Sequence, residues 1–255
     1  MPRPWLSSLL LILLLCGSAA AQETGAGGGP VIEGAIGQRP QNETVTLTRG
    51  TCVSDTASGT TYNSAGFQAT GTGAATATET YYPVVVVLAE DNAATFGINS
   101  MTINGVPAIE VIDEDGTGVV DAALYRGAGE VSGTTINVSV TASESLTSGM
   151  VVCAWALKNL RSFTPTSSVQ DDETNSAATV LTTGTTVSGG FVVAGCVGSA
   201  IADTVVWAVI TEREDTQNAN FDYSNADGAT TGSSMANTCD FTNSNDNSGV
   251  AAAFR

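Results

Sequence analysis

The chain has 255 residues, 42% of them hydrophobic, which is enough for one large domain or two small ones. Its 25 Asp and Glu residues far outnumber its 8 Lys and Arg residues, and it contains no histidine. An acidic surface repels nucleic acids and anionic membranes, so nucleic-acid binding is excluded. Without histidine, Ser-His-Asp and Cys-His catalysis and His-ligated metals are excluded too. The remaining enzymatic options are carboxylate pairs, a metal held by oxygen ligands, or a Ser or Thr nucleophile with an unusual base.

Residues 1–21 have the pattern of a secretory signal peptide. Arg3 precedes an apolar run at 9–15, and small residues with an A-x-A cleavage pattern follow. A lipoprotein leader is disfavoured by the leucine before Cys16, and an uncleaved anchor needs about 20 apolar residues. The sequence therefore predicts cleavage before Gln22 and a secreted or cell-surface protein with no membrane segment after cleavage.

Residues 22–42 are rich in glycine and predict a flexible arm or linker. From residue 43 to 255, short apolar runs alternate with Gly, Asn, Asp, Ser and Thr, which predicts a single β-domain. Strands are expected at 44–48, 84–89, 100–103, 108–112, 119–125, 135–141, 150–157, 178–182, 191–197, 205–211 and 250–254.

Three of these segments carry the most information. In 135–141, Ile, Val and Val alternate with polar residues, as in a half-buried strand. The runs 150–157 and 191–197 are apolar on both faces and predict central strands. Asn104–Gly105 predicts a two-residue hairpin. Together they indicate an all-β fold, an antiparallel β-sandwich of jelly-roll or Ig-like type.

Few segments look helical or clearly unstructured. Short helices are conceivable only around 89–95 and 156–163. The low-complexity stretches 54–80 and 215–248 predict long surface loops, where binding residues commonly lie.

Four cysteines follow the leader: Cys52, Cys153, Cys196 and Cys239. An even number in an exported protein predicts two disulfides, although sequence alone leaves three pairings open. Cys153–Cys196 is preferred because both lie in apolar strands, which leaves Cys52–Cys239. The alternative is four buried free thiols. A metal site is disfavoured because no C-x-x-C spacing occurs.

One acidic segment has the features of a calcium loop. Asp113, Asp115, Thr117 and Asp121 place oxygen ligands around Gly116. An EF-hand would need a further early ligand and a glutamate at its twelfth position. The alternative to calcium is an acidic β-turn, where Asp and Gly are common.

Two further acidic clusters are candidates for the paired carboxylates of a glycoside hydrolase. Their alternative is solvated acidic loops. The clusters comprise Asp171, Asp172 and Glu173, and Glu212, Glu214 and Asp215.

Aromatic residues divide into two groups. Trp155 and Trp207 lie in strong strands and are expected in the core rather than on a sugar-stacking face. Aromatic residues in or near predicted loops are better candidates for a binding surface: Tyr62, Phe67, Tyr81, Tyr82, Phe221 and Tyr223.

Several segments follow one another in a recognisable order: VVVVLAED, SMTINGVPAIEVID, VVDAALYRGAG, GTTINVSVTASE, MVVCAWALKNL, GGFVVAGC and GVAAAFR. Over roughly residues 80–255 this order resembles an uncharacterised β-sandwich domain that recurs in phage tail and virion proteins and in marine bacterial genomes. The resemblance implies a β-sandwich and transfers no catalytic residue. The signal peptide departs from virion proteins, which are assembled in the cytoplasm.

These features favour a secreted, non-enzymatic sandwich that acts as a surface, adhesive or assembly component. It would bind glycan or protein through its loops. The arm is expected to contribute to self-assembly if 31–36 adds as a strand to a neighbouring copy. The alternatives are a virion structural protein and an extracellular carbohydrate-active enzyme that uses carboxylates.

Overall fold

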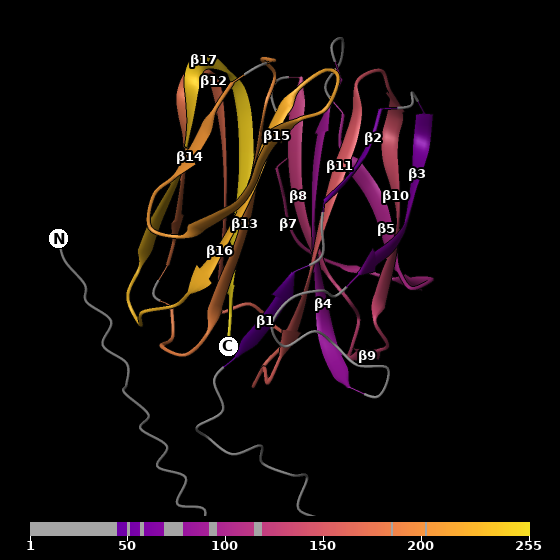
Figure 1. Cartoon of the computed structure of the whole chain (residues 1–255), viewed down its shortest axis with the longest axis vertical. Helices are drawn as coiled ribbons and strands as arrows, with labels where there is room; N and C mark the ends of the chain where they lie inside the picture. Colours follow the sequence, from indigo (N-terminus) through magenta and orange to yellow (C-terminus); the bar gives the residue numbers. More distant parts are fainter. Residues whose placement is uncertain are drawn as a thin grey trace, which may run out of the picture. The chain divides into compact units, whose positions relative to one another are not determined.

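The computed structural model describes residues 45–49, 52–56, 59–68, 79–91, 96–114, 119–184, 186–201 and 203–255. All of them fall within one compact unit, Arg39–Arg255. The described residues form antiparallel strands without any helix (Figure 1), which confirms the all-β sandwich class. The predicted signal peptide, 1–21, and arm, 22–42, lie outside the described residues.

A central sheet occupies the middle of this unit. Its order is β1 (Thr46–Arg49), β11 (Gly149–Lys158), β4 (Thr80–Glu90), β8 (Val120–Arg126) and β7 (Ile109–Glu114). The short strand β2 (Val53–Asp55) also pairs with β11, and β9 (Val131–Ser132) pairs with β4. Strands β1 and β2 therefore follow β11 one after the other.

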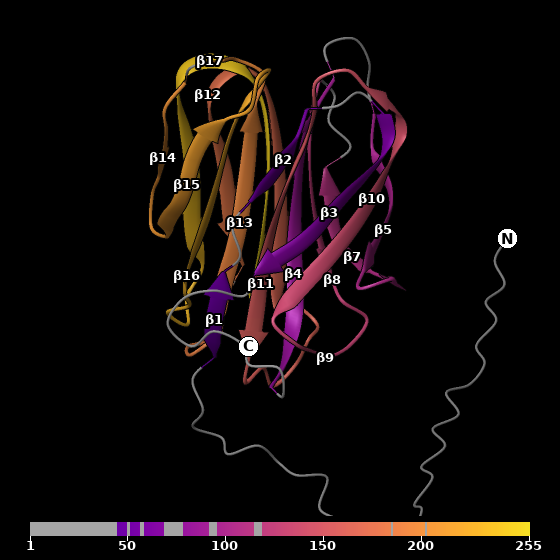
Figure 2. The same cartoon turned by 45° about the vertical axis from the view of Figure 1, so that its right-hand side comes forward.

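Two further sheets cover the two faces of the central sheet (Figures 1 and 2). The four-stranded sheet contains β3 (Gly59–Gln68), β10 (Thr135–Leu146), β5 (Ile98–Ile103) and β6 (Val106–Pro107). The C-terminal sheet contains β12 (Ser167–Thr183), β17 (Met235–Phe254), β13 (Phe191–Gly198), β16 (Asp222–Ala229) and β15 (Thr211–Gln217), with β14 (Val205–Trp207) paired to β17.

Strand β4 shows why the central sheet needs a partner on each side. Val85 and Val87 pack into the core shared with the four-stranded sheet, whereas Val86 and Leu88 pack into the core shared with the C-terminal sheet. Side chains alternate along a strand, so a strand buried on both faces has an unbroken apolar sequence. The VVVVLA run is that pattern. Gly195 of β13 lets the C-terminal sheet approach closely, since a Cβ there would lie 2.7 Å from Val86 Cγ1.

A third core lies on the outer side of the C-terminal sheet. The register between β12 and β17 shifts between Glu173 and Ala178, and the two strands bend over together (Figure 1). Beyond the bend, Leu181 and Cys239 cover the face of β13 that carries Val192 and Cys196. The ribbon formed by β12 and β17 thus lines two cores with one pair of strands.

Several expected elements are confirmed. Ile136, Val138 and Val140 of β10 are buried on one face as the alternation predicts. Asn104 and Gly105 join β5 to β6 with positive φ angles of 52° and 77°, as a two-residue hairpin requires.

Other expectations are wrong. The helix expected around 156–163 is the end of β11 followed by irregular chain, and the described part of 89–95 is the end of β4. The stretches 54–80 and 215–248 contain strands β3, β16 and much of β17 where loops were expected. The expected strand 205–211 is interrupted at Val209, whose φ is 74° and around which Ile210 N donates to Ala208 O at 2.9 Å.

Candidate functional site

The disulfides differ from the preferred pairing. Cys52 is bonded to Cys153, and Cys196 to Cys239. Alternation along the strands explains the difference: Cys153 faces the core between the central and C-terminal sheets, whereas Cys196 faces the outer core. Two cysteines in neighbouring sheets cannot bridge when one of them points away, so the Cys153–Cys196 and Cys52–Cys239 prediction is wrong.

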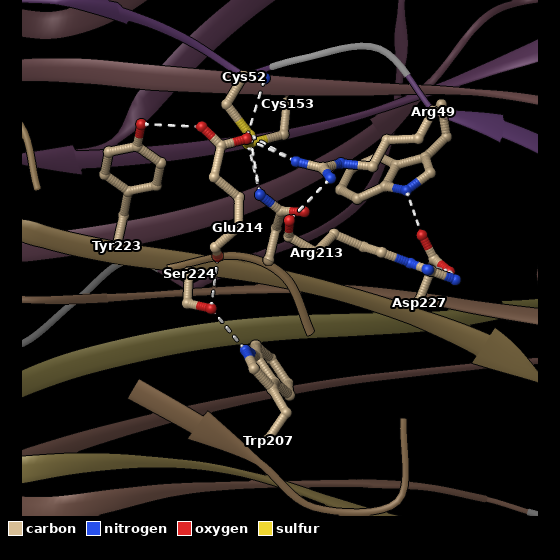
Figure 3. A network of polar contacts seen from close by, with 11 residues as sticks. Arg49, Cys52, Cys153, Trp207, Arg213, Glu214, Tyr223, Ser224 and Asp227 are labelled. Carbon is tan, nitrogen blue, oxygen red and sulfur yellow. Dashed lines mark hydrogen bonds and ion pairs between the residues drawn. A yellow bond between two sulfur atoms is a disulfide. The ribbon is translucent and has the colours of Figure 1, made fainter. Parts of the chain in front are cut away.

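The richest group of polar contacts surrounds the first disulfide (Figure 3). Arg49 is the last residue of β1 in the central sheet, and Glu214 lies on β15 of the C-terminal sheet. Arg49 Nη2 donates to Glu214 Oε2 at 2.5 Å, and Nη1 donates to the backbone O of Arg213 at 3.1 Å. This ion pair joins two sheets that share no strand pairing, and the two side chains are only 20% and 26% exposed.

The disulfide itself is embedded in these contacts. The backbone N of Cys52 donates to Glu214 Oε2 at 3.4 Å. Asn225 Nδ2, from β16, contacts the Cys52 sulfur at 2.8 Å and the Cys153 sulfur at 3.5 Å. Tyr223 OH donates to the other Glu214 oxygen, Oε1, at 3.4 Å. Glu214 therefore binds groups from β1, β16 and the segment before β2.

A second ion pair lies close by in the same interface (Figure 3). Arg213 donates through Nε and Nη2 to Asp227 Oδ1, at 2.8 and 2.6 Å. The indole N–H of Trp155, from β11 of the central sheet, donates to Asp227 Oδ2 at 3.1 Å. Asp227 is fully buried, so both its oxygens need these donors.

Trp207 carries the network to the outer core. Its indole Nε1 donates to Ser224 Oγ at 2.8 Å, and Ser224 Oγ donates to the backbone O of Glu214 at 2.8 Å. Trp155 and Trp207 are 0% and 8% exposed, which confirms their expected place in the core. Each also uses its N–H as a structural donor, as buried tryptophans usually do.

Burial sets the charge states in this network. Burial, together with the nearby negative charge of Glu214, raises the pKa of the Tyr223 hydroxyl far above its ordinary value. Burial lowers the pKa of Arg49, and Glu214 and Asp227 oppose that shift. The tyrosine therefore stays a hydrogen-bond donor throughout the physiological range.

The other members of the acidic clusters have different surroundings. Glu212 is exposed, and Asp215 Oδ2 accepts from the backbone N of Val205 at 3.2 Å. Asp171 Oδ2 accepts from the backbone N of Val180, across the bend in β12, at 2.7 Å. Asp172 and Glu173 lie beside that bend. Of these residues, Glu214 forms the partly buried ion pair with Arg49.

Asp113 and Asp121 of the predicted calcium loop lie on β7 and β8. Asp113 pairs in register with Ala123, so Asp113 and Asp121 share one face of the central sheet. Asp115 lies outside the described residues. Within the described ranges, no group of three or more Asp, Glu, Cys or His side chains is arranged to hold a metal ion. The calcium site stays a prediction.

Most of the aromatic residues expected on a binding surface are buried. Tyr62, Tyr81, Phe221 and Tyr223 are between 0% and 4% exposed, so that expectation is wrong for them. Tyr62, Tyr81 and Tyr223 lie in strands β3, β4 and β16, and Phe221 directly precedes β16. Tyr82 is partly exposed and packs on Phe163 with ring centroids 4.4 Å apart. The side chain of Phe67 lies outside the described residues.

Sequence reasoning missed Arg49, Arg213, Asn225 and Asp227. A weak signal exists: β16 reads DYSNADGA, and buried polar residues at alternate positions need partners. In the described part of the chain, no helix is long and apolar enough to cross a bilayer. Comparison with known protein families, with curated proteins and with solved structures finds no match to this chain.

Proposed function

We propose that this chain is a secreted, non-enzymatic β-sandwich that acts as a surface, adhesive or assembly component. It binds glycan or protein through its loops. The observation that supports this proposal most directly is the set of contacts made by Glu214 and Asp227, the two carboxylates held between the sheets. Each is bound by an arginine and by a further donor, and together they join the central sheet to the C-terminal sheet.

That use favours a structural over a catalytic role. A glycosidase needs one protonated and one ionised carboxyl flanking an accessible sugar bond. Glu214 and Asp227 are instead each bound by an arginine inside the interface, and their side chains are only 26% and 0% exposed. Removing either would leave a buried donor without its partner. We call these two carboxylates, with the arginines Arg49 and Arg213 that bind them, the clamp between the sheets.

Two observations support an extracellular location. Both disulfides join segments that lie far apart in sequence, with separations of 101 and 43 residues. Disulfides of this kind form and persist in oxidising compartments. The signal-peptide pattern at 1–21 gives the route of export.

The test compares binding with turnover on the same oxidised protein. The chain is applied to an immobilised glycan panel and, separately, to a panel of glycosidase substrates between pH 4 and 8, with and without calcium. We expect glycan binding or self-association without turnover, both in the wild type and in Glu214→Gln. Turnover that Glu214→Gln abolishes would overturn the proposal in favour of a carbohydrate-active enzyme.

The arm adds a second, separable element to the proposal. Strand β1 pairs with β11 of its own chain, so residues 31–36 would pair with another edge, such as β3, β7 or β15 of a neighbouring copy. Deleting residues 22–41 tests this part. Unchanged assembly after the deletion would make the arm a linker only.

A further inference from the structure

The positive charges outside the clamp gather at one end of the sandwich. Six Lys and Arg residues are described, and Arg49 and Arg213 belong to the network between the sheets. The other four lie together at the end where β8 and β11 finish and β17 reaches the last residue. We call these residues, Arg126, Lys158, Arg161 and Arg255, the basic end.

Strand pairing shows that these residues share one end. Arg126 pairs with Val84 near the start of β4, and Leu157 pairs with Tyr82, two residues closer to that start. The backbone N of Arg161 donates to the backbone O of Arg255 at 2.7 Å. The end of the central sheet and the end of the C-terminal sheet therefore meet here.

The opposite end carries acidic residues from all three sheets. Gly149 pairs with Glu90 there, and Asn220 Nδ2 donates to the backbone O of Ser148 across the sheets at 2.9 Å. No lysine or arginine of the described chain lies at this end. Its partly or fully exposed carboxylates form what we call the acidic end: Asp55, Asp113, Glu144, Asp172, Glu173, Asp203 and Asp246.

The basic end offers guanidinium groups and aromatic surface together. Lys158 forms an ion pair with Glu79 at 3.0 Å. Glu110 pairs with Tyr125, next to Arg126, and Glu130 directly precedes β9, which pairs with the start of β4. Within the described residues, Arg126, Arg161 and Arg255 form no ion pair. The Arg126 guanidinium lies 4.8 Å from the centre of the partly buried Phe163 ring, which also packs on Tyr82. Arginine over an aromatic ring is a favoured partner for carboxylates at interfaces.

We propose that copies of this chain associate head to tail, with the basic end of one copy against the acidic end of the next. The inference deepens the assembly role proposed above and rests on it. A contact between two different patches of the same chain is heterologous, and it produces rings or filaments rather than a closed dimer. The acidic end of a second copy is the partner that this charge arrangement fits, because one chain carries both surfaces.

Salt should affect this association in an unusual way. The whole chain carries a formal charge of −17, so copies repel each other at low ionic strength. At about 0.01 M salt the screening length is roughly 30 Å, close to the ~36 Å length of an eleven-residue strand such as β4. At about 0.1 M it falls to roughly 10 Å. The overall repulsion is then screened while contacts between adjacent end groups survive, so association should be strongest at intermediate salt.

Reciprocal charge reversal tests the proposal. Variant one is Arg161→Glu with Arg255→Glu, and variant two is Glu173→Arg with Asp246→Arg. In each variant, the substituted side chains of one end meet like charges on the opposite end of the next copy. Sedimentation velocity at about 0.1 M salt should show association weakened at least tenfold for each. An equal mixture should recover association, because in an alternating array the substituted residues of the two variants face each other with opposite charges.

The control is Glu212→Arg, which changes the net charge on the flank of β15 and leaves both ends intact. It should associate as the wild type does. Wild-type association that both end variants retain would overturn head-to-tail contact and leave the assembly role standing. A wild type that stays monomeric at every salt concentration would overturn the inference, and the glycan panel then decides separately whether a surface role stands. Binding of a soluble polyanion by the basic end of such a monomer would reassign that end to a polyanionic ligand.

Discussion

Replacing Asp227 by alanine should destabilise the protein more than any substitution of an exposed acid. The Asp227 side chain is fully buried and binds Arg213 and Trp155. Without the carboxylate, the Trp155 indole N–H is left unsatisfied between two sheets, which costs about 1–3 kcal/mol. Arg213 is 37% exposed and can turn to water, so the lost ion pair adds only about 0–1 kcal/mol. The two costs sum to about 1–4 kcal/mol. Trp155 is fully buried, which places the first cost near its upper end, so we expect a loss of about 3 kcal/mol in the free energy of unfolding.

Urea unfolding of the oxidised protein, followed by tryptophan fluorescence, measures this loss. For a domain of this size, about 3 kcal/mol corresponds to a melting temperature lower by roughly 6–12 °C. Asp227→Asn keeps an acceptor for Trp155 and should lose about half as much. Asp240→Ala, at an exposed position on β17, is the matched control and should stay within about 0.5 kcal/mol of the wild type. If Asp227→Ala also stays within that limit, the clamp does not hold the sheets together.

Three further changes test other parts of the structure. Removing the 101-residue disulfide with Cys52→Ala and Cys153→Ala should cost up to about 4.7 kcal/mol, against up to about 4.0 for Cys196→Ala with Cys239→Ala, in urea unfolding; equal stability of oxidised and double-variant protein would contradict the pairing. Burial raises the pKa of Glu90, so ionisation of this carboxyl opposes folding. The free energy of unfolding is therefore highest below pH 4.5, where Glu90 is protonated in both states, and it falls as the pH rises through the pKa of the folded state. Glu90→Gln should therefore raise the free energy of unfolding at pH 7.5 and leave it unchanged at pH 4, and an equal gain at both values would refute this reading. Val209→Gly relieves a positive φ at a 66% exposed side chain and should raise the melting temperature, whereas Val206→Gly, 59% exposed within β14, should lower it; a fall in both would show that the turn is not strained.

The apolar strands could be predicted because burial leaves a periodic trace in sequence. The alternation in β10 gave its inward face, and the unbroken run in β4 indicated a strand covered on both sides. Asn104 and Gly105 gave the hairpin because few other residues adopt positive φ at two successive positions. These strands and this turn are determined by the residues within each segment, without reference to distant parts of the chain.

Polar strands and the clamp could not be predicted in the same way. Strand β16 is buried, yet Asp222, Ser224 and Asn225 give it the composition of a loop. Their burial is tolerated because distant residues such as Trp207 and the Cys52–Cys153 disulfide supply partners. Which residues become the hydrogen-bond partners of these side chains depends on how the sheets stack, and that is a property of the whole fold. The prediction of the disulfide pairing was wrong for the same reason, since the pairing depends on the face of the C-terminal sheet on which Cys196 lies.

Zero-length carbodiimide cross-linking tests the central claim, an assembly component that associates end to end, most directly. The chain has a single lysine side chain, Lys158, at the basic end, and its 3.0 Å ion pair with Glu79 gives an internal reference cross-link. An equal mixture of unlabelled and ¹⁵N-labelled protein at about 0.1 M salt should yield mixed-isotope cross-links from Lys158 to acidic-end residues such as Glu173 and Asp246. If Lys158 couples to Glu79 within one copy and to no acidic-end residue of another, the account is contradicted.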